Sequence, residues 1–204
     1  MAEERVIVNA LVRQALFAAK EVMGGHGLAT VLRTSGLERF IYNLPPDDLN
    51  PGVNTSEYAH LNEAIEAFYG RGARGMLRRI GKASFQYAVR EQATLMGLAG
   101  VALKLMPQRQ RIKFILNQMV SALKKTNPQV DGWVEDSEGR LALCERTCAI
   151  CYGRKSELPI CHLYIGSISE AVRWATEQNY EVHETHCIAK GDEYCRFEIG
   201  DMMQ

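Results

Sequence analysis

The sequence predicts an α+β protein in which N-terminal helices pack with a small antiparallel sheet. Apolar residues recur at helical spacing through most of the first 125 residues, and alternation replaces this period after Asn127-Pro128. One further helical stretch separates two predicted hairpins. The predicted helices come first in the chain, and an antiparallel sheet with one helix comes last. This order favours the α+β class over a doubly wound sheet. With 204 residues the chain can bury one good-sized core, so we treat it as a single domain.

Residues 1–70 are predicted to form a helical arm and a loop within that domain. Gly24-Gly25 is expected to end the first helix. The segment 44–52 is expected to be the main loop, because its three prolines and two aspartates favour turns and remove backbone donors. Thr55 or Ser56 is expected to cap the helix that follows. The predicted helices span 6–23, 28–42 and 55–68.

Residues 71–204 are predicted to form the main body of the domain. Four glycines lie among the arginines of segment 70–81, which predicts close approach of another helix, a backbone or a ligand. A phosphate-cradling loop is disfavoured, because the strand-loop-helix order and the GK[ST] ending are missing. A long helical stretch then ends before Pro107. The next helix, 108–125, carries an apolar stripe that favours the core over a membrane surface: Ile112, Ile115, Met119 and Leu123.

Two hairpins and a helix are predicted after residue 128. The first hairpin flanks the turn 136–139. The helix covers 158–178, is entered by Pro159 and carries Cys161 in its first turn. The last hairpin is centred on Gly191, and this pairing sets Cys187 opposite Cys195.

The net charge of zero conceals a segregation along the chain. Residues 1–70 hold 5 Lys/Arg and 9 Asp/Glu, residues 71–125 hold 12 and 1, and residues 131–204 hold 7 and 14. We expect the basic middle to pack beside the acidic end, within one fold or a homodimer. The alternative is that residues 71–125 dock an anionic partner. No membrane span, nucleic-acid segment or signal peptide is indicated, so cytoplasmic residence is the default.

The six cysteines all fall in the last third of the chain, unlike the spread of a disulfide scaffold. In a reducing compartment such clustering favours a metal site at Cys187 and Cys195 over a disulfide or plain buried thiols. Cys161 is the best third ligand, because a helix N-terminus lowers a thiol pKa. Strict alternation favours His183 as the fourth ligand, whereas Glu184 would need a bulge. The further candidates are His186 and His162.

These residues resemble a known family, the 4-vinyl reductase domains. The resemblance rests on Cys161, Glu184-x-x-Cys187, Gly191-Asp192 and Cys195-x-Phe197, with the preceding helix and the glycine-arginine segment. It covers roughly residues 70–200. The family is related in fold to TRAPP vesicle-tethering subunits, to nitric-oxide-signalling ligand-binding domains and to the sensory domain of phenol-responsive activators. It implies a structural Zn²⁺ held by four ligands: Cys161, Glu184, Cys187 and Cys195.

A second group of thiols, Cys144-x-x-x-Cys148-x-x-Cys151, is not expected to belong to this metal site. Its spacing matches that of iron-sulfur sites in radical enzymes, but the large barrel of those enzymes cannot be built here. A redox-sensitive patch or loop thiols near a ligand are favoured, and a second metal or cluster remains an alternative.

The first functional hypothesis is a receptor or carrier for a hydrophobic small molecule, bound between the helices and the sheet. The residues expected to contact it are Arg78, Phe85, Met96, Met119 and Trp133, with core packing as the alternative for the apolar ones. Because the family includes a protein of bacteriochlorophyll synthesis, the resemblance implies a tetrapyrrole or a chlorophyll precursor as ligand. An assembly or scaffold role comes second. A vinyl reductase comes third, because no electron-carrying cofactor motif is visible.

Overall fold

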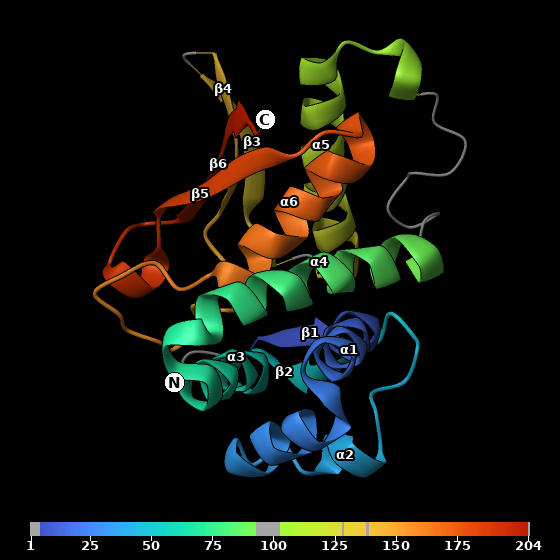
Figure 1. The fold of residues 1–204 in the computed structure, drawn as a ribbon, viewed down its shortest axis with the longest axis vertical. Helices are drawn as coiled ribbons and strands as arrows, with labels where there is room; N and C mark the ends of the chain where they lie inside the picture. Colours follow the sequence, from blue (N-terminus) through green and yellow to red (C-terminus); the bar gives the residue numbers. More distant parts are fainter. Residues whose placement is uncertain (1–4, 93–102, 128, 138, 204) are drawn as a thin grey trace.

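The N-terminal part of the chain forms a helical layer (Figure 1). The computed structural model describes residues 5–92, 103–127, 129–137 and 139–203. Within the described residues the layer consists of two short paired strands and three helices. The part of the predicted long helix between 93 and 102, including Met96, lies outside the described residues. The elements of the layer are β1 (Val6–Val8), α1 (Asn9–Thr34), α2 (Arg39–Tyr42), β2 (Pro51–Asn54) and α3 (Thr55–Tyr69).

Four predictions for this layer are wrong. One of them is the single helix over 28–42, because α1 runs to Thr34 and the separate helix α2 covers Arg39–Tyr42. Residues Val6–Val8 form a strand rather than the start of a helix, because three β-branched residues favour extended backbone and pair antiparallel with β2. The helix also continues beyond Gly24, where a single residue with φ 78° produces a kink. The third helix is confirmed, but Asn54 caps it through a capping box with Glu57 rather than Thr55 or Ser56.

Two glycines, Gly81 and Gly166, lie where two helices pack too closely for a side chain. After η1 (Gly70–Gly72), α4 (Ala73–Gln92) crosses α6 (His162–Thr176), and this is the most extensive helix contact in the described chain. A Cβ added at Gly81 would lie 1.9 Å from the carbonyl oxygen of Leu163, and one at Gly166 would lie 2.1 Å from that of Arg78. The predicted close approach is therefore confirmed. The segment is helical, not a phosphate-cradling loop.

The C-terminal part contains a four-stranded antiparallel sheet in the order β3-β4-β6-β5. Both predicted hairpins are confirmed, and so is the predicted α+β fold class. The first helix after the η2 turn (Leu103–Leu105) is α5, and its residues Ile112, Ile115 and Met119 are buried, as core packing requires. The elements of this part are α5 (Gln108–Thr126), β3 (Gly132–Ser137), β4 (Arg140–Glu145), β5 (Tyr180–His186), η3 (Ile188–Lys190) and β6 (Cys195–Met202).

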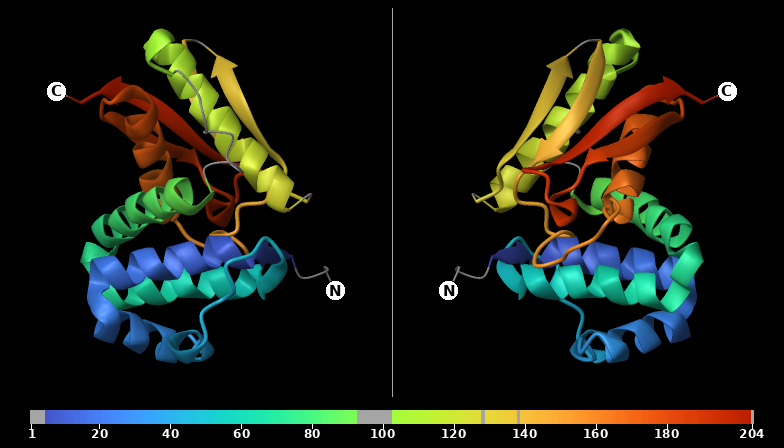
Figure 2. Two further views of the ribbon diagram at one scale, coloured as in Figure 1. Left: turned by 90° about the vertical axis from the view of Figure 1, so that its right-hand side faces the viewer. Right: turned by 90° about the vertical axis from the view of Figure 1, so that its left-hand side faces the viewer.

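The two parts meet along α4. Figure 2 shows α1, α2 and α3 on one side of α4, and the sheet with α5 and α6 on the other. The apolar core is continuous across this boundary, because Leu16 of α1, Leu77 of α4 and Ile168 of α6 are buried in one cluster. None of the described helices combines the length and apolar composition needed to cross a bilayer.

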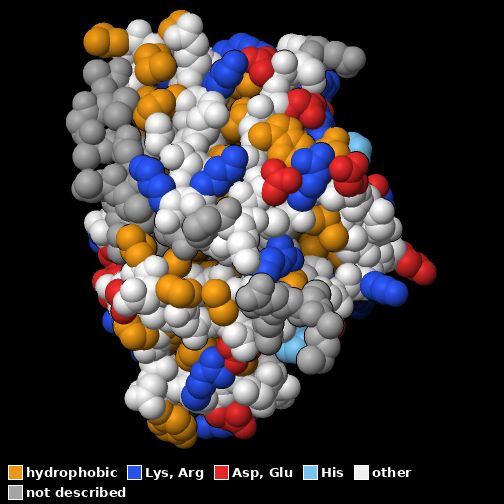
Figure 3. All heavy atoms as spheres, turned by 180° about the vertical axis from the view of Figure 1, so that it is seen from behind, with side chains coloured by type: hydrophobic (Ala, Val, Ile, Leu, Met, Phe, Trp, Pro, Cys, Tyr) orange, Lys and Arg blue, Asp and Glu red, His pale blue; other side chains and the backbone are white. Residues whose placement is uncertain are grey.

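Part of the segregated charge is neutralised within the fold. Arg109 and Lys113 of the basic helix α5 both pair with Asp136 of β3, and Lys104 pairs with Glu177. On the face drawn in Figure 3, basic and acidic side chains lie interspersed. The basic middle of the chain therefore packs partly beside the acidic end, as expected.

Candidate metal centre and ligand cavity

Four cysteine sulfurs converge between α6, the last hairpin and the loop after β4. The Sγ of Cys151 lies 3.2 Å from that of Cys161, 3.6 Å from that of Cys187 and 3.5 Å from that of Cys195. The Sγ atoms of Cys161 and Cys195 are 3.9 Å apart. One carboxylate oxygen of Glu184 joins these four sulfurs, and all five atoms lie within 4.8 Å of one another. We call this group the thiol cluster.

The turn around Gly191 holds Cys187 and Cys195 in the thiol cluster. Gly191 adopts φ 101°, a conformation that side chains disfavour. The backbone N–H of Cys187 donates to Asp192 Oδ2 at 2.7 Å, and the N–H of Ile188 donates to Cys195 Sγ at 3.4 Å. This N–H would also donate to the thiolate form, which is the form that binds metal, although Cys148 and Cys151 raise the pKa of the Cys195 thiol.

A bulge brings Glu184 to the same side as Cys187. The pairing of β5 with β6 shifts register between Glu184 and His186. The bulge that Glu184 needs in order to face the metal site is therefore present. Its Oε2 accepts the backbone N–H of Cys161 at 2.9 Å, and its Oε1 is buried without a hydrogen-bond partner among the described residues. Burial, followed by the neighbouring Cys187, raises the pKa of the Glu184 carboxyl to about 8.

The cluster is closed to solvent. Cys161, Cys187 and Cys195 are 0% exposed, and Cys151 is 2% exposed. All six cysteines are free thiols. Cys161 is the N-cap of α6 rather than a first-turn residue. Burial, together with hydrogen bonds from the neighbouring thiols, raises the pKa of the Cys161 thiol, which corrects the expected lowering. Several buried thiolates would need a cation among them, so a metal that binds here would displace the protons of the thiols.

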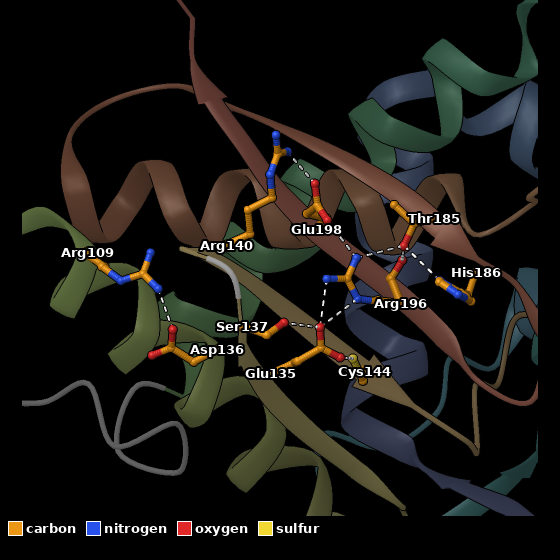
Figure 4. A network of polar contacts seen from close by, with 10 residues as sticks. All are labelled: Arg109, Glu135, Asp136, Ser137, Arg140, Cys144, Thr185, His186, Arg196 and Glu198. Atoms are coloured by element: carbon orange, nitrogen blue, oxygen red, sulfur yellow. Dashed lines mark hydrogen bonds and ion pairs between the residues drawn. The ribbon is translucent and has the colours of Figure 1, made fainter.

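The two histidines considered as fourth ligands lie outside the cluster. His183 contacts Glu181 on the exposed side of β5, and the ring of His186 stacks on Tyr194. Figure 4 shows His186 beside Thr185 and Arg196, in a polar network on the sheet. His162 is half-buried next to the cluster, where burial, Arg78 and Arg74 lower its pKa to about 4.

The structure does not bring Cys144, Cys148 and Cys151 together, although their sequence spacing suggested one group. Cys151 lies in the thiol cluster, and the Sγ of Cys148 is 3.5 Å from that of Cys161. The Cys144 side chain instead points to Glu135 in the network of Figure 4. Sequence reasoning missed the place of Cys151. The pair Cys148-x-x-Cys151 has a spacing common among zinc ligands, and this signal could have indicated it.

A mostly apolar cavity of about 210 Å³ lies beside the thiol cluster, between the N-terminal layer and the C-terminal part. Residues from both parts line it, including Phe85 and Met119, two of the predicted ligand contacts. Two other predicted contacts lie elsewhere: Arg78 is exposed on α4, and the Trp133 ring packs against Tyr194. Side chains of the sheet alternate between its faces, which explains why Trp133 of β3 points away from the cavity.

Polar side chains interrupt the apolar lining, among them Gln14, Glu145 and Tyr164. Gln14 is 1% exposed, and its Nε2 donates to no described residue. Burial raises the pKa of the Glu145 carboxyl to about 7, although Thr147 donates to its Oε1 at 3.1 Å. The Tyr164 hydroxyl lies beside this carboxyl without a well-aligned hydrogen bond. A buried donor without a partner is costly, so Gln14 points to an absent acceptor.

The arrangement of helices and strands corresponds to a known fold. The Fe(II) unliganded H-NOX protein from K. algicida aligns with a TM-score of 0.60 at 14% identity, over 97% of this chain and 97% of that chain. The Fe(II)NO form of an H-NOX protein from S. oneidensis aligns with a TM-score of 0.57 at 12% identity, over 94% and 99%. An oxygen-binding H-NOX domain related to soluble guanylate cyclases aligns with a TM-score of 0.59 at 12% identity, over 95% of this chain and 93% of that chain. The chain therefore has the H-NOX type of fold.

A comparison at the level of sequence families is more specific. Residues 145–201 match the family model of the 4-vinyl reductase domain, which confirms the predicted resemblance to that family. This match covers the loop, α6 and the last hairpin, and therefore every residue of the thiol cluster. Among curated proteins, no sequence matches this chain. Together with the cavity, the family match and the fold support a small-molecule-binding domain.

The cavity does not fit a haem held by histidine. Haem iron is held by a side chain such as His, Cys, Met or Tyr, most often His in globins and peroxidases. None of the five histidines of the chain, all of which the structure describes, lines the cavity. Of the side chains that do line it, the phenols of Tyr58 and Tyr164 have raised pKa values, because burial disfavours their ionised form.

Proposed function

We propose that this protein is a zinc-stabilised receptor or carrier for a hydrophobic small molecule. The observation that carries the proposal is the apolar cavity enclosed by residues from both parts of the fold, directly beside the thiol cluster. Ile7, Leu11 and Gln14 line it from the N-terminal layer, and Met119 and Leu163 line it from the other side. Residues 1–70 and 71–204 would thus form one ligand-binding unit.

The lining indicates the chemistry of the ligand. Its body would be apolar, since Phe85, Met119 and their aliphatic neighbours can contact only apolar groups. It would carry one neutral acceptor, such as a carbonyl or hydroxyl oxygen, to accept the free N–H of Gln14. A carboxylate placed next to Glu145 would be disfavoured, whereas one placed next to Arg5, which also lines the cavity, would be favoured.

The size of the cavity bears on the tetrapyrrole hypothesis. An apolar cavity of about 150 Å³ holds one benzene ring. The 210 Å³ cavity therefore suits a ligand of one or two rings in the conformation described. A tetrapyrrole or chlorophyll precursor would require the two parts of the fold to separate along α4, and it would not use Arg78 within the present cavity. We keep it as the larger alternative.

The role of zinc would be structural. Cys161, Cys187 and Cys195 would supply three ligands, and Glu184 or Cys151 would supply the fourth. Such a site has no open position for water, so it would join the last hairpin to the start of α6 rather than perform chemistry. Because α6 also carries Leu163 and Tyr164 of the cavity wall, zinc would fix that wall.

Co-purification followed by native mass spectrometry tests the binding function. Protein isolated from its native host should carry a non-covalent small molecule and about one zinc ion per chain. Ala122→Phe places a ring in the cavity and should abolish co-purification, whereas Ala67→Phe on the exposed side of α3 should not. Equal ligand occupancy in both variants would exclude this cavity as the site. An absorbance spectrum would identify a tetrapyrrole.

A scaffold role is the second candidate, favoured by the exposed basic residues Arg71, Arg74, Arg78 and Arg79. In the described part of the chain, none of them forms an ion pair with another described residue. A partner docked on this side of α4, or a homodimer formed there, should dissociate when Arg74 and Arg78 are replaced by Glu. Colourless, ligand-free protein that co-purifies with another chain would favour this role.

The third candidate, a vinyl reductase that works without a partner protein, would need turnover dependent on NAD(P)H.

A further inference from the structure

The separations of the four sulfurs match the edges of a tetrahedral zinc site. A Zn–S bond of about 2.3 Å puts two sulfurs of a regular tetrahedron roughly 3.8 Å apart. Four of the six separations among Cys151, Cys161, Cys187 and Cys195 are 3.2, 3.5, 3.6 and 3.9 Å. The other two are within 4.8 Å. Only small shifts would place all four around one ion.

Cys151 is the cysteine whose sulfur lies within 3.6 Å of all three other sulfurs. Its sulfur touches each of the other three, so a metal bound by those three alone would still have an uncoordinated thiol against it. Cys151 is only 2% exposed. A buried thiol so close to a divalent cation is deprotonated by it and becomes a ligand.

Glu184 already has a structural task. Its Oε2 accepts the N–H of Cys161 at 2.9 Å, and Cys161 is the N-cap of α6. This hydrogen bond satisfies a donor at the start of the helix and orients the residue that carries the sulfur. Backbone and side-chain partners that orient a ligand in this way usually stand just outside the coordination shell. Oε1 is the competing ligand atom, because it is buried without a described partner.

We infer that the metal ligands are the thiolates of Cys151, Cys161, Cys187 and Cys195, and that Glu184 is a positioning residue for Cys161. The inference rests on the zinc part of the proposed function and changes its fourth ligand. It also makes the site a single-ion centre. An iron-sulfur cluster places several irons between its thiolates and would need them farther apart than 4.8 Å. Cys148 contacts Cys161 but lies outside the set of ligand atoms.

X-ray absorption at the zinc edge tests this inference on the full-length protein. Four sulfurs at about 2.3 Å are expected, whereas a bound carboxylate would appear as one oxygen at about 2.0–2.2 Å. A first shell of three sulfurs and one oxygen, with the oxygen lost in Glu184→Gln, would overturn the inference while leaving zinc in place. Folded protein that binds no zinc would overturn both the inference and the zinc part of the proposed function.

Zinc affinity of two variants, measured by competition with a chromophoric chelator, gives a second readout. Glu184→Gln should lower the affinity by about 10–100-fold, the usual effect of an outer partner. Cys151→Ser should lower it by more, and Cys144→Ser, which changes a thiol outside the cluster, should leave it unchanged. A larger loss in Glu184→Gln than in Cys151→Ser would contradict the assignment. If Cys151→Ser fails to fold, the absorption spectrum of the wild-type protein still decides.

Discussion

The sulfur of Cys148 lies 3.5 Å from the sulfur of Cys161, and the Cys148 side chain also lines the ligand cavity. One thiol therefore touches both the cavity and the proposed zinc site. A ligand that displaces Cys148 would press on a zinc ligand, and a change in the zinc site would alter the cavity wall. Binding at one site should thus change the affinity at the other, to the same degree in both directions.

The contact predicts how Cys148→Ala behaves. The variant should keep about one zinc per chain, because Cys148 is not among the proposed ligands. In the wild-type protein, removal of zinc by a chelator should weaken binding of the recovered ligand, and this dependence should shrink in Cys148→Ala. Titration calorimetry with and without zinc measures both. The same dependence on zinc in the two proteins would mean that the contact carries no coupling.

Replacement of Gln14 should change stability and binding in opposite directions. Gln14→Met removes a buried donor without a described partner, and such a donor costs about 1–3 kcal/mol. The ligand-free variant should therefore be more stable by about 1 kcal/mol. Its affinity for the recovered ligand should fall about tenfold, since the ligand loses one hydrogen bond. Chemical denaturation and calorimetry test the two parts. A variant that is both less stable and unchanged in binding would refute the assigned role.

The glycines of α4 offer a matched pair. Gly81→Ala places a methyl group against the backbone of Leu163 and should destabilise the fold by about 1–3 kcal/mol, because two helices must separate. Gly75→Ala in the same helix has open space around its Cβ and should stabilise by about 0.5–1 kcal/mol. Urea midpoints at constant m-value measure both changes. Equal effects of the two substitutions would show that the crossing of α4 and α6 is looser than described.

Glu145 should make stability depend on pH. Its folded-state pKa is about 7, above the reference value of 4.5, because burial favours the protonated form. The contribution is complete below pH 4.5 and is lost as the pH rises through 7. At about 1.4 kcal/mol per unit, the loss amounts to about 3 kcal/mol. Glu145→Gln should lack this loss, so the free energy of unfolding of wild type and variant should diverge between pH 5 and 8. Glu63→Gln, on the exposed side of α3, is the control.

Much of the fold could be predicted from the sequence because local signals agreed with the final packing. The helices 55–68 and 108–125 have one apolar side each, and both are present within one or two residues. The N-terminal strand β1 was missed, because three apolar residues before a helix have the same composition as a helix start and their partner lies in the distant strand β2. Tertiary pairing decided that segment.

The candidate site was predictable to the extent that each residue had a local signal. Cys187 and Cys195 flank a Gly-Asp turn, and that turn is what sets them close together. The position of Cys151 depends on the irregular loop between β4 and α6, whose path no periodicity describes. Phe85 and Met119 of the cavity followed from apolar helical stripes, whereas Trp133 was misplaced because alternation alone does not say which side of a sheet is covered.

The bulge in β5 has a consequence for recognising such sites in sequences. In a regular strand, residues that point inward are separated by even numbers of positions. Glu184 and Cys187 are three positions apart and both lie at the thiol cluster, where the pairing of β5 shifts register after Glu184 and the strand ends before Cys187. An odd spacing between two polar residues near a strand end, followed by a glycine turn and a second cysteine, is therefore itself a sign that the strand is irregular there.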